Sequence, residues 1–234
     1  MKIENRKSEV IGGQEDVLRF RRLLPTSDSR LPPFIALAAF VTAGACVSVL
    51  PEAPPASARY VVSDVTVSAP SPAAGWTLGV EEPEATLAYN TAKIAVARAP
   101  GRIEYFAGGE WVDRAPRLFG VALVRSFENT GAIKGVGSRL TLPVSTYVLQ
   151  TDIRRLGVAE NGSDKRAEVA VFARLTNGRS VIHASRLFTA ETALAADTPA
   201  AAAAALDAAL SAVQREIVPW TMEEAGKAQA PAAR

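Results

Sequence analysis

The residue with the most distinctive chemistry is Cys46, the only cysteine among 234 residues. A cysteine thiolate is a strong nucleophile, and lipid anchors of exported bacterial proteins are attached to such a sulfur. The three residues before it, Ala43, Gly44 and Ala45, are small, as is typical of the cleavage site of an export signal. We therefore predict cleavage between Ala45 and Cys46, followed by lipidation of Cys46.

The apolar run before this cysteine, Phe34 to Ala45, supports the same interpretation. It is shorter than the roughly 20 apolar residues that a membrane-spanning helix needs. Its length fits the hydrophobic region of an export signal. Ala43-Gly44-Ala45-Cys46 resembles a lipobox, with Ala43 where leucine is usual. Two or more acyl chains on Cys46 would give a stable membrane anchor.

Two alternatives to lipidation stay open at this point. Residues 47–50 extend the apolar run as far as Pro51, so the segment can be an uncleaved single-pass anchor. The run can also be an ordinary export signal, with Cys46 incidental. Lipidation has the advantage that it explains an unpaired thiol in an exported chain.

The other reactive side chains are not arranged for catalysis or metal binding. His183 is the only histidine, so no multi-histidine metal site can form, and we interpret it as structural. The glycines of residues 135–137 lack the third glycine of a dinucleotide-binding loop. Three acidic residues lack the alternating spacing of a calcium loop: Glu81, Glu82 and Glu84. We predict a protein that is not an enzyme and has no metal and no cofactor besides its covalent lipid.

The aromatic residues offer a weak indication of a partner surface. Tyr105, Phe106 and Trp111 surround a glycine pair, and Trp220 follows the last predicted helix. Aromatic side chains are enriched at protein interfaces, but they are as often buried in cores. Both interpretations stay open from the sequence.

The net charge of +2 comes from the N-terminal segment. Residues 1–45 hold seven of the 26 Lys and Arg and five of the 24 Asp and Glu, which leaves 19 of each in the rest of the chain. A neutral domain gives no reason to expect binding of nucleic acid or electrostatic capture of anionic lipids.

Alternating β-branched residues predict the strands that would build the domain. Asn177-Gly178 between two such runs indicates a tight hairpin whose two turn residues both have positive φ. A strand at 102–111 is expected to run into a loop at Gly108-Gly109, and a parallel crossover can join it to the strand at 144–153. The predicted strands are 59–67, a short one within 85–99, 102–111, 144–153, 167–175 and 179–189.

Two helices are expected. Asp113 is placed to cap the first, which would end near Gly131 with a left-handed residue. Thr198 and Pro199 open the second. Its buried stripe would be Leu206, Leu210, Val213 and Ile217, and Pro219 would end it.

The predicted fold is a single α/β domain with a mixed sheet of about five or six strands flanked by two main helices. Four regions are expected along the chain. They are a signal peptide with a long n-region at 1–45, the lipidated cysteine with a Pro/Ala tether at 46–58, the folded domain at 59–220, and a disordered tail at 221–234.

Taken together, these segments resemble the ABC-type transport auxiliary lipoproteins and are similar to the paraquat-inducible protein C group. The segments that carry the resemblance follow the lipobox and the tether. They are RIEYFAGGEWVDRAPRLF from Arg102, ARLTNGRSVIHASRLFTAE from Ala173, and an alanine-rich helix ending in IVPW at Trp220.

This resemblance implies an outer-membrane lipoprotein on the periplasmic face that serves a mammalian-cell-entry type transporter. Its partner would be the bridging substrate-binding protein, and its cargo phospholipid or another apolar molecule. Docking of the bridging protein, with a homo-oligomeric ring of lipoproteins, is the expected mode of action. A scaffold lipoprotein for envelope assembly, such as a cell-wall synthase activator or a lipopolysaccharide-export component, is the alternative.

Overall fold

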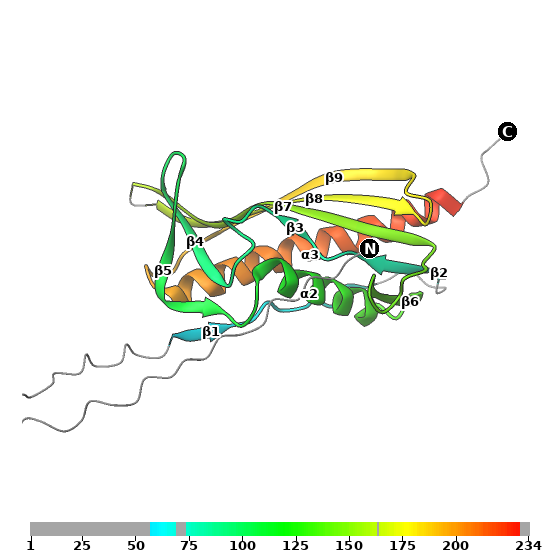
Figure 1. Cartoon of the computed structure of the whole chain (residues 1–234), viewed down its shortest axis with the longest axis horizontal. Helices are drawn as coiled ribbons and strands as arrows, with labels where there is room; N and C mark the ends of the chain where they lie inside the picture. The colour runs from blue at the N-terminus through cyan, green and yellow to red at the C-terminus, as the bar shows by residue number, and fades with distance from the viewer. Residues whose placement is uncertain (1–56, 69–73, 163, 230–234) are drawn as a thin grey trace, which may run out of the picture. The chain divides into compact units, whose positions relative to one another are not determined.

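The computed structural model describes residues 57–68, 74–162 and 164–229 (Figure 1). The predicted signal, Cys46 and most of the tether lie outside the described residues. The elements in chain order are β1 Ala58–Tyr60, β2 Ala74–Val80, β3 Glu84–Ala85, β4 Lys93–Ala99, β5 Arg102–Trp111, α2 Ala115–Asn129, β6 Ile133–Ser138, β7 Tyr147–Asn161, β8 Asp164–Asn177, β9 Ile182–Ala193 and α3 Pro199–Gln229.

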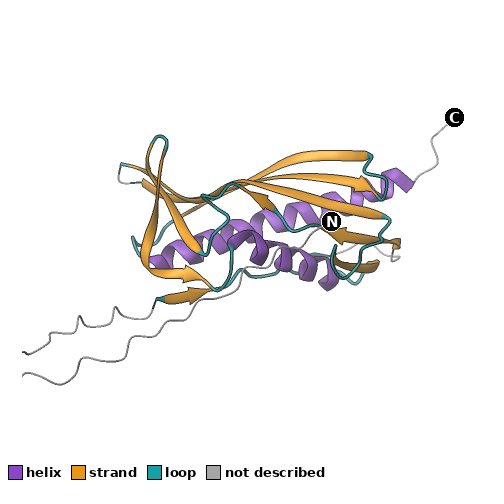
Figure 2. Ribbon diagram, in the orientation of Figure 1, coloured by secondary structure: helices purple, strands orange, loops and turns teal. Residues whose placement is uncertain are grey.

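The described residues form two layers, a mixed nine-stranded sheet and two helices that lie together on one of its faces (Figure 2). The predicted α/β class, with a mixed sheet and two main helices, is confirmed. The sheet has more strands than the expected five or six, because β2, β3 and β6 are short, and β2 and β6 contain glycines. None of the described helices is long and apolar enough to span a bilayer.

The long strand β7 is the centre of the sheet. One edge pairs with β8 along its whole length, from Tyr147–Asn177 to Asn161–Asp164. Its other edge pairs in succession with β2, β3 and β4, all parallel to it. Three short segments are thus aligned along one strand, and β6, β5 and β1 extend the sheet from them.

The predicted crossover between the strands at 102–111 and 144–153 is wrong. β4 lies between β5 and β7 and pairs antiparallel with β5, because the two form a hairpin through Gly101, whose φ is 74°. The glycine pair does not end β5 either. Gly108 takes a φ of 77° inside the strand, which then continues to Trp111.

The hairpin of β8 and β9 is confirmed, but its turn is wider than predicted. Ser180, not Gly178, has a positive φ of 62°. The side chain of Asn177 holds the loop, since its Oδ1 accepts hydrogen bonds from the backbone N–H of Arg179 at 2.9 Å and of Val181 at 3.0 Å. A four-residue loop closed by an asparagine side chain replaces the expected two-residue turn.

Helix α2 begins one residue later than predicted. Arg114 is its N-cap residue, and the Asp113 carboxylate accepts a hydrogen bond from the Arg114 N–H at 2.7 Å and pairs with Arg117 at 3.2 Å. Asp113 therefore stabilises the first turn without capping it. Gly131, with a φ of 61°, confirms the expected left-handed residue after the helix.

Helix α3 confirms its start and its buried stripe but not its end. The Thr198 hydroxyl accepts a hydrogen bond from the N–H of Ala201 at 3.2 Å, and the four stripe residues are at most 1% exposed. The helix continues through Pro219 to Gln229. Packing keeps the helix intact beyond the proline, because the Trp220 ring contacts Phe188 edge-on, with ring centroids 5.4 Å apart. Residues 221–229, expected in a disordered tail, are helical.

The segment after β1 leaves the sheet, although it was predicted as one strand to residue 67. It crosses both helices and is held by a buried polar network. The N–H of Val65 donates to Ser126 Oγ at 2.9 Å, and Ser126 Oγ donates to Gln214 Oε1 at 2.8 Å. Gln214 Nε2 donates in turn to the carbonyl of Ser63 at 2.9 Å. The extended segment, α2 and α3 are thereby tied together.

Candidate functional site

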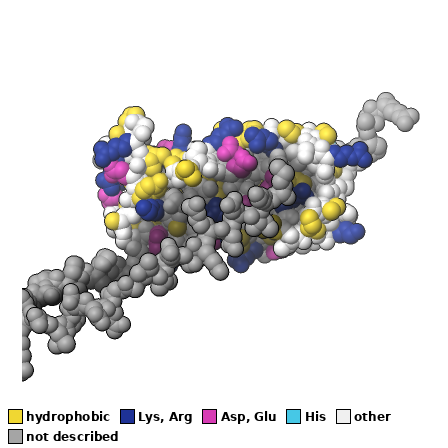
Figure 3. Space-filling view, in the orientation of Figure 1, with side chains coloured by type: hydrophobic (Ala, Val, Ile, Leu, Met, Phe, Trp, Pro, Cys, Tyr) yellow, Lys and Arg dark blue, Asp and Glu magenta, His cyan; other side chains and the backbone are white. Residues whose placement is uncertain are grey.

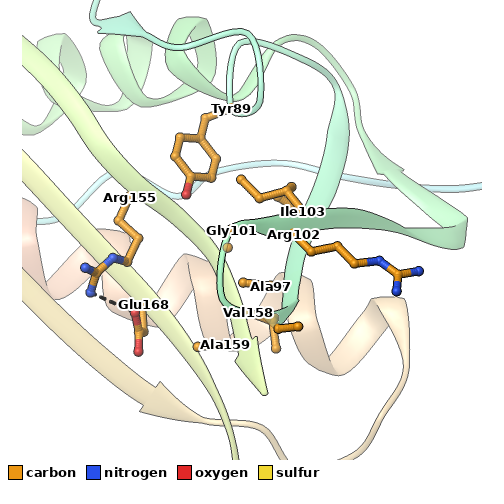
Figure 4. Close-up of a pocket in the computed structure, with 12 residues that line it drawn as sticks. Tyr89, Ala97, Gly101, Arg102, Ile103, Arg155, Val158, Ala159 and Glu168 are labelled. Atoms are coloured by element: carbon orange, nitrogen blue, oxygen red, sulfur yellow. Dashed lines mark hydrogen bonds and ion pairs between the residues drawn. The ribbon is translucent and has the colours of Figure 1, made fainter. Parts of the chain in front are cut away.

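The open face of the sheet, opposite the helices, carries a cavity of about 270 Å³ between β4, β5 and β7 (Figure 4). We call it the alanine pocket, because alanines and glycines make up half of the residues that line it. These small residues are Ala95, Ala97, Ala99, Gly101, Gly157 and Ala159.

The hollow exists because strands β4 and β7 meet through small outward-facing residues. Ala97 pairs directly with Ala159. The two strands approach closely at Gly157, since a Cβ placed on this residue would lie 3.0 Å from the carbonyl oxygen of Ala95. A larger residue at 157 would push the strands apart, and larger residues at 97 or 159 would fill the pocket. Side-chain size therefore creates the site.

One end of the pocket is polar. Arg155 Nη1 donates to Glu168 Oε2 at 2.8 Å, and the half-buried Tyr89 directs its hydroxyl into the space beside them (Figure 4). Burial raises the pKa of the Tyr89 hydroxyl above its ordinary value, the Arg155 guanidinium lowers it, and the Glu168 carboxylate raises it. The hydroxyl therefore stays protonated at neutral pH and can both donate and accept a hydrogen bond.

Exposed apolar side chains form the rim. Leu87 is 86% exposed, and Ile103 and Tyr105 are each 39% exposed. The β4–β5 register pairs Ile103 with Ala97 and Tyr105 with Ala95, which places both on the pocket face. The Tyr105 hydroxyl donates to the carbonyl of Ala88 at 3.3 Å, beside Leu87. Apolar side chains gather at the β4–β5 end in Figure 3, next to charged groups.

The aromatic residues suggested by the sequence are separated in the structure. Tyr105 lies on the pocket rim, whereas Phe106 is half-buried against the core. Trp111 and Trp220 are buried, at 1% and 9% exposure, and do not contribute to a surface. The sequence did not identify three residues as part of a site: Leu87, Tyr89 and Ile103. Ile103 had been placed in a strand, but the periodicity of a strand cannot show that a loop tyrosine and a strand isoleucine share a cavity.

The other residues that sequence analysis considered have structural roles. His183 is exposed and contacts Tyr147 edge-on, with ring centroids 5.6 Å apart. Glu81 accepts a hydrogen bond from Gln150 at 2.9 Å, and Glu82 pairs with Arg114 at 2.6 Å. Within residues 57–68, 74–162 and 164–229, no group of three His, Cys, Asp or Glu is placed to hold a metal ion.

A second groove, of about 490 Å³, lies between α2, the end of β2 and the segment from Val136 to Thr141. Its apolar residues include Val121 and the fully exposed Leu140. Charges of both signs alternate along its edges, and Arg139 approaches Glu81 at 3.8 Å. The groove has no concentrated polar end like that of the alanine pocket.

The polar end of the alanine pocket can be tested by titration. Arg155→Met should raise the pKa of Tyr89 further, because it removes a positive charge that favours the phenolate and leaves Glu168 without its ion pair. Ultraviolet absorbance of tyrosinate measures the shift, and Tyr89→Phe identifies the signal. Arg154→Met is the matched control, since that guanidinium lies over Phe172 at 4.3 Å. An unchanged or lowered pKa would contradict the arrangement.

The arrangement is suited to binding an apolar group. Its walls are small and apolar residues, and three of its four polar side chains, Tyr89, Arg155 and Glu168, lie together at one end. These features fit an apolar group that carries one polar atom at its end.

Comparison with known proteins matches this domain over nearly all of its length. Residues 60–218 match the family described as ABC-type transport auxiliary lipoprotein component. An uncharacterized protein of Bradyrhizobium diazoefficiens is 33% identical over 145 residues, which are 62% of this chain. The match spans 39% of that relative's length, so this chain corresponds to only part of it.

Solved structures share the fold. A crystal structure of a Xanthomonas campestris protein of the family DUF330 is 29% identical, with a TM-score of 0.67, and the match covers 72% of this chain and 97% of that one. The crystal structure of another, uncharacterized protein has a TM-score of 0.54 at 12% identity, with 69% and 99% of the two chains covered. The second likeness concerns the fold alone.

Proposed function

Because the chain belongs to the ABC-type transport auxiliary lipoprotein family, we propose that it is the lipid-anchored docking component of a mammalian-cell-entry type transporter. In this role it sits on the periplasmic face of the outer membrane and binds the bridging substrate-binding protein. The cargo is phospholipid or another apolar molecule. The family match across residues 60–218, nearly the whole folded domain, carries the proposal.

Anchoring through Cys46 fits this role. The residue after it is Val47, not the aspartate that retains lipoproteins at the inner membrane, so sorting to the outer membrane is expected. The Pro/Ala tether to residue 58 is short, and proline stiffens it. The domain is thereby kept near the bilayer, where a bridging protein arriving from the inner membrane would meet it.

The alanine pocket supports docking as the mode of action. Protein interfaces concentrate their binding energy in pockets that receive a side chain and are surrounded by groups that exclude water. A small cavity lined by Ile103, with the exposed Leu87 and Tyr105 beside the lining residues Tyr89 and Ala95, fits this pattern. We assign ATP hydrolysis to another subunit of the transporter.

Photocrosslinking in native membranes tests the proposal. A benzophenone amino acid at Leu87 of the full-length protein should capture the bridging protein, identified by mass spectrometry. The same group at Ala208, exposed on α3 in the opposite layer, is the control for proximity without docking. Capture of a cell-wall synthase or an outer-membrane barrel protein would favour the scaffold alternative. A ring of copies would appear as crosslinked oligomers of this chain.

A further inference from the structure

The alanine pocket has features that specify what it binds. We propose that it receives one aromatic side chain with a polar atom, a tyrosine or a tryptophan, presented by the bridging protein. This inference rests on the proposed function, because it names the group by which that partner docks. It adds a recognition element that family membership does not provide.

The size of the pocket argues for a side chain. Its volume of about 270 Å³ lies below the roughly 300–1,000 Å³ of typical small-molecule sites. A single large aromatic side chain fills such a space, whereas a phospholipid would leave most of its surface outside. The pocket is therefore matched to one residue of a partner.

The shape of the wall argues for a flat group. Ala97, Gly157 and Ala159 present methyl groups and bare backbone from two paired strands, which gives a smooth surface. An aromatic ring can lie against such a surface with close contact over its face. Aromatic side chains also lose few rotatable bonds on binding, so that more of the contact energy is retained.

The polar end argues for tyrosine or tryptophan over phenylalanine or leucine. The Tyr89 hydroxyl points into the cavity, and the Glu168 carboxylate beside it is mostly buried and accepts hydrogen bonds (Figure 4). A phenol O–H or an indole N–H can donate to either of them. A wholly apolar side chain would cover these groups without replacing their contacts with water, which is unfavourable.

The rim completes the site. Ile103, on β5, lines the cavity and is exposed, and the exposed Leu87 lies two residues before Tyr89 in the loop that precedes β4. When a partner covers them, they lose their contact with water and shield the hydrogen bonds inside. Arg102, by contrast, directs its guanidinium away from the cavity (Figure 4) and belongs to the surrounding polar surface.

The main experiment fills the pocket in the full-length protein. Ala97→Leu places a larger side chain in the cavity, and Ala97 is exposed, so the fold should tolerate it. We expect about thirtyfold or greater weakening of bridging-protein binding in detergent-solubilised membranes, as for the loss of an interface hot spot. Ala208→Leu, the matched control on α3, should bind like the unchanged protein. Circular dichroism verifies that both variants are folded.

Tyr89→Phe tests the hydrogen bond separately. It keeps the ring and removes the hydroxyl, so binding should weaken by about two- to tenfold. On the partner, the tyrosine or tryptophan found crosslinked to position 87 should give a loss as large as that of Ala97→Leu when changed to alanine. Combining the two changes should add little, because both remove the same contact.

Each outcome is decisive. Normal binding by Ala97→Leu, or a crosslinked partner segment without tyrosine or tryptophan, overturns the pocket inference and leaves the proposed function intact. Crosslinking of position 87 to lipid acyl chains or to a second copy of this chain also overturns it. If the unchanged protein captures no bridging protein from position 87 or from Leu140 in the second groove, the proposed function itself fails.

Discussion

Gln214→Ala should lower the free energy of unfolding by about 3 kcal/mol or more, a large fraction of the stability of a typical domain. Gln214 lies on α3 and is fully buried against α2 and the segment that crosses both helices. Its amide accepts a hydrogen bond from Ser126 and donates one to the carbonyl of Ser63. Alanine would remove both hydrogen bonds and leave a cavity in the core, although Ser126 keeps the carbonyl of Ala122 at 2.7 Å as a partner.

The effect is large because Gln214 joins α3 to both α2 and the extended segment. Ser126 Oγ, itself fully buried, donates to Gln214 and accepts from the N–H of Val65. Removing one member disturbs the hydrogen bonds of the others, since the low local dielectric makes each unpaired group costly. The extended segment should detach first, since its other attachments are the short strand pairing at β1 and hydrogen bonds to Asp207 and Asn129.

Urea unfolding monitored by far-ultraviolet circular dichroism measures the change. Arg215→Ala, one residue along the same helix and exposed, is the control and should change stability by no more than about 0.5 kcal/mol. In a double-mutant cycle, Gln214→Ala and Ser126→Ala should be strongly non-additive. A loss below about 1 kcal/mol for Gln214→Ala would mean that the network contributes little.

Local patterns in the sequence predicted much of the sheet and the buried side of α3. The alternation from Ala167 to Leu175 gives the core face of β8, and the stripe from Leu206 to Ile217 gives that of α3. Both signals depend only on residues close in the chain. The prediction failed where tertiary packing determines how far an element extends. Pro219 is tolerated because Trp220 and the residues after it pack against β9 and β7.

The candidate site was harder to predict because its signal is the small size of its residues. Ala97 and Ala159 look like ordinary strand alanines, and they form a cavity only because β4 and β7 pair in that register. The pairing joins residues more than 60 positions apart. Tyr105 was proposed from its aromatic character, which was sufficient to find the rim but not the pocket beside it.

Cys46→Ser should release the protein from the membrane fraction almost completely. A serine hydroxyl cannot replace the thiolate as the acceptor of diacylglycerol. Each buried methylene of an acyl chain contributes about 0.8 kcal/mol, and a single chain binds membranes only weakly, with an association constant of about 10⁴ M⁻¹. Loss of every chain should therefore remove the anchor.

Fractionation followed by mass spectrometry of the N-terminal peptide distinguishes the three models of the N-terminal segment. Lipidation predicts an acylated peptide beginning at Cys46, and its loss from membranes in the serine variant. An uncleaved anchor predicts membrane retention of Cys46→Ser with residues 34–50 still attached. An ordinary export signal predicts an unmodified Cys46 thiol in the unchanged protein, and no membrane retention of either form. Docking needs the domain to be held at the membrane, so the proposed role is compatible with lipidation and with an uncleaved anchor, but not with an ordinary export signal. Only lipidation makes Cys46 the attachment point.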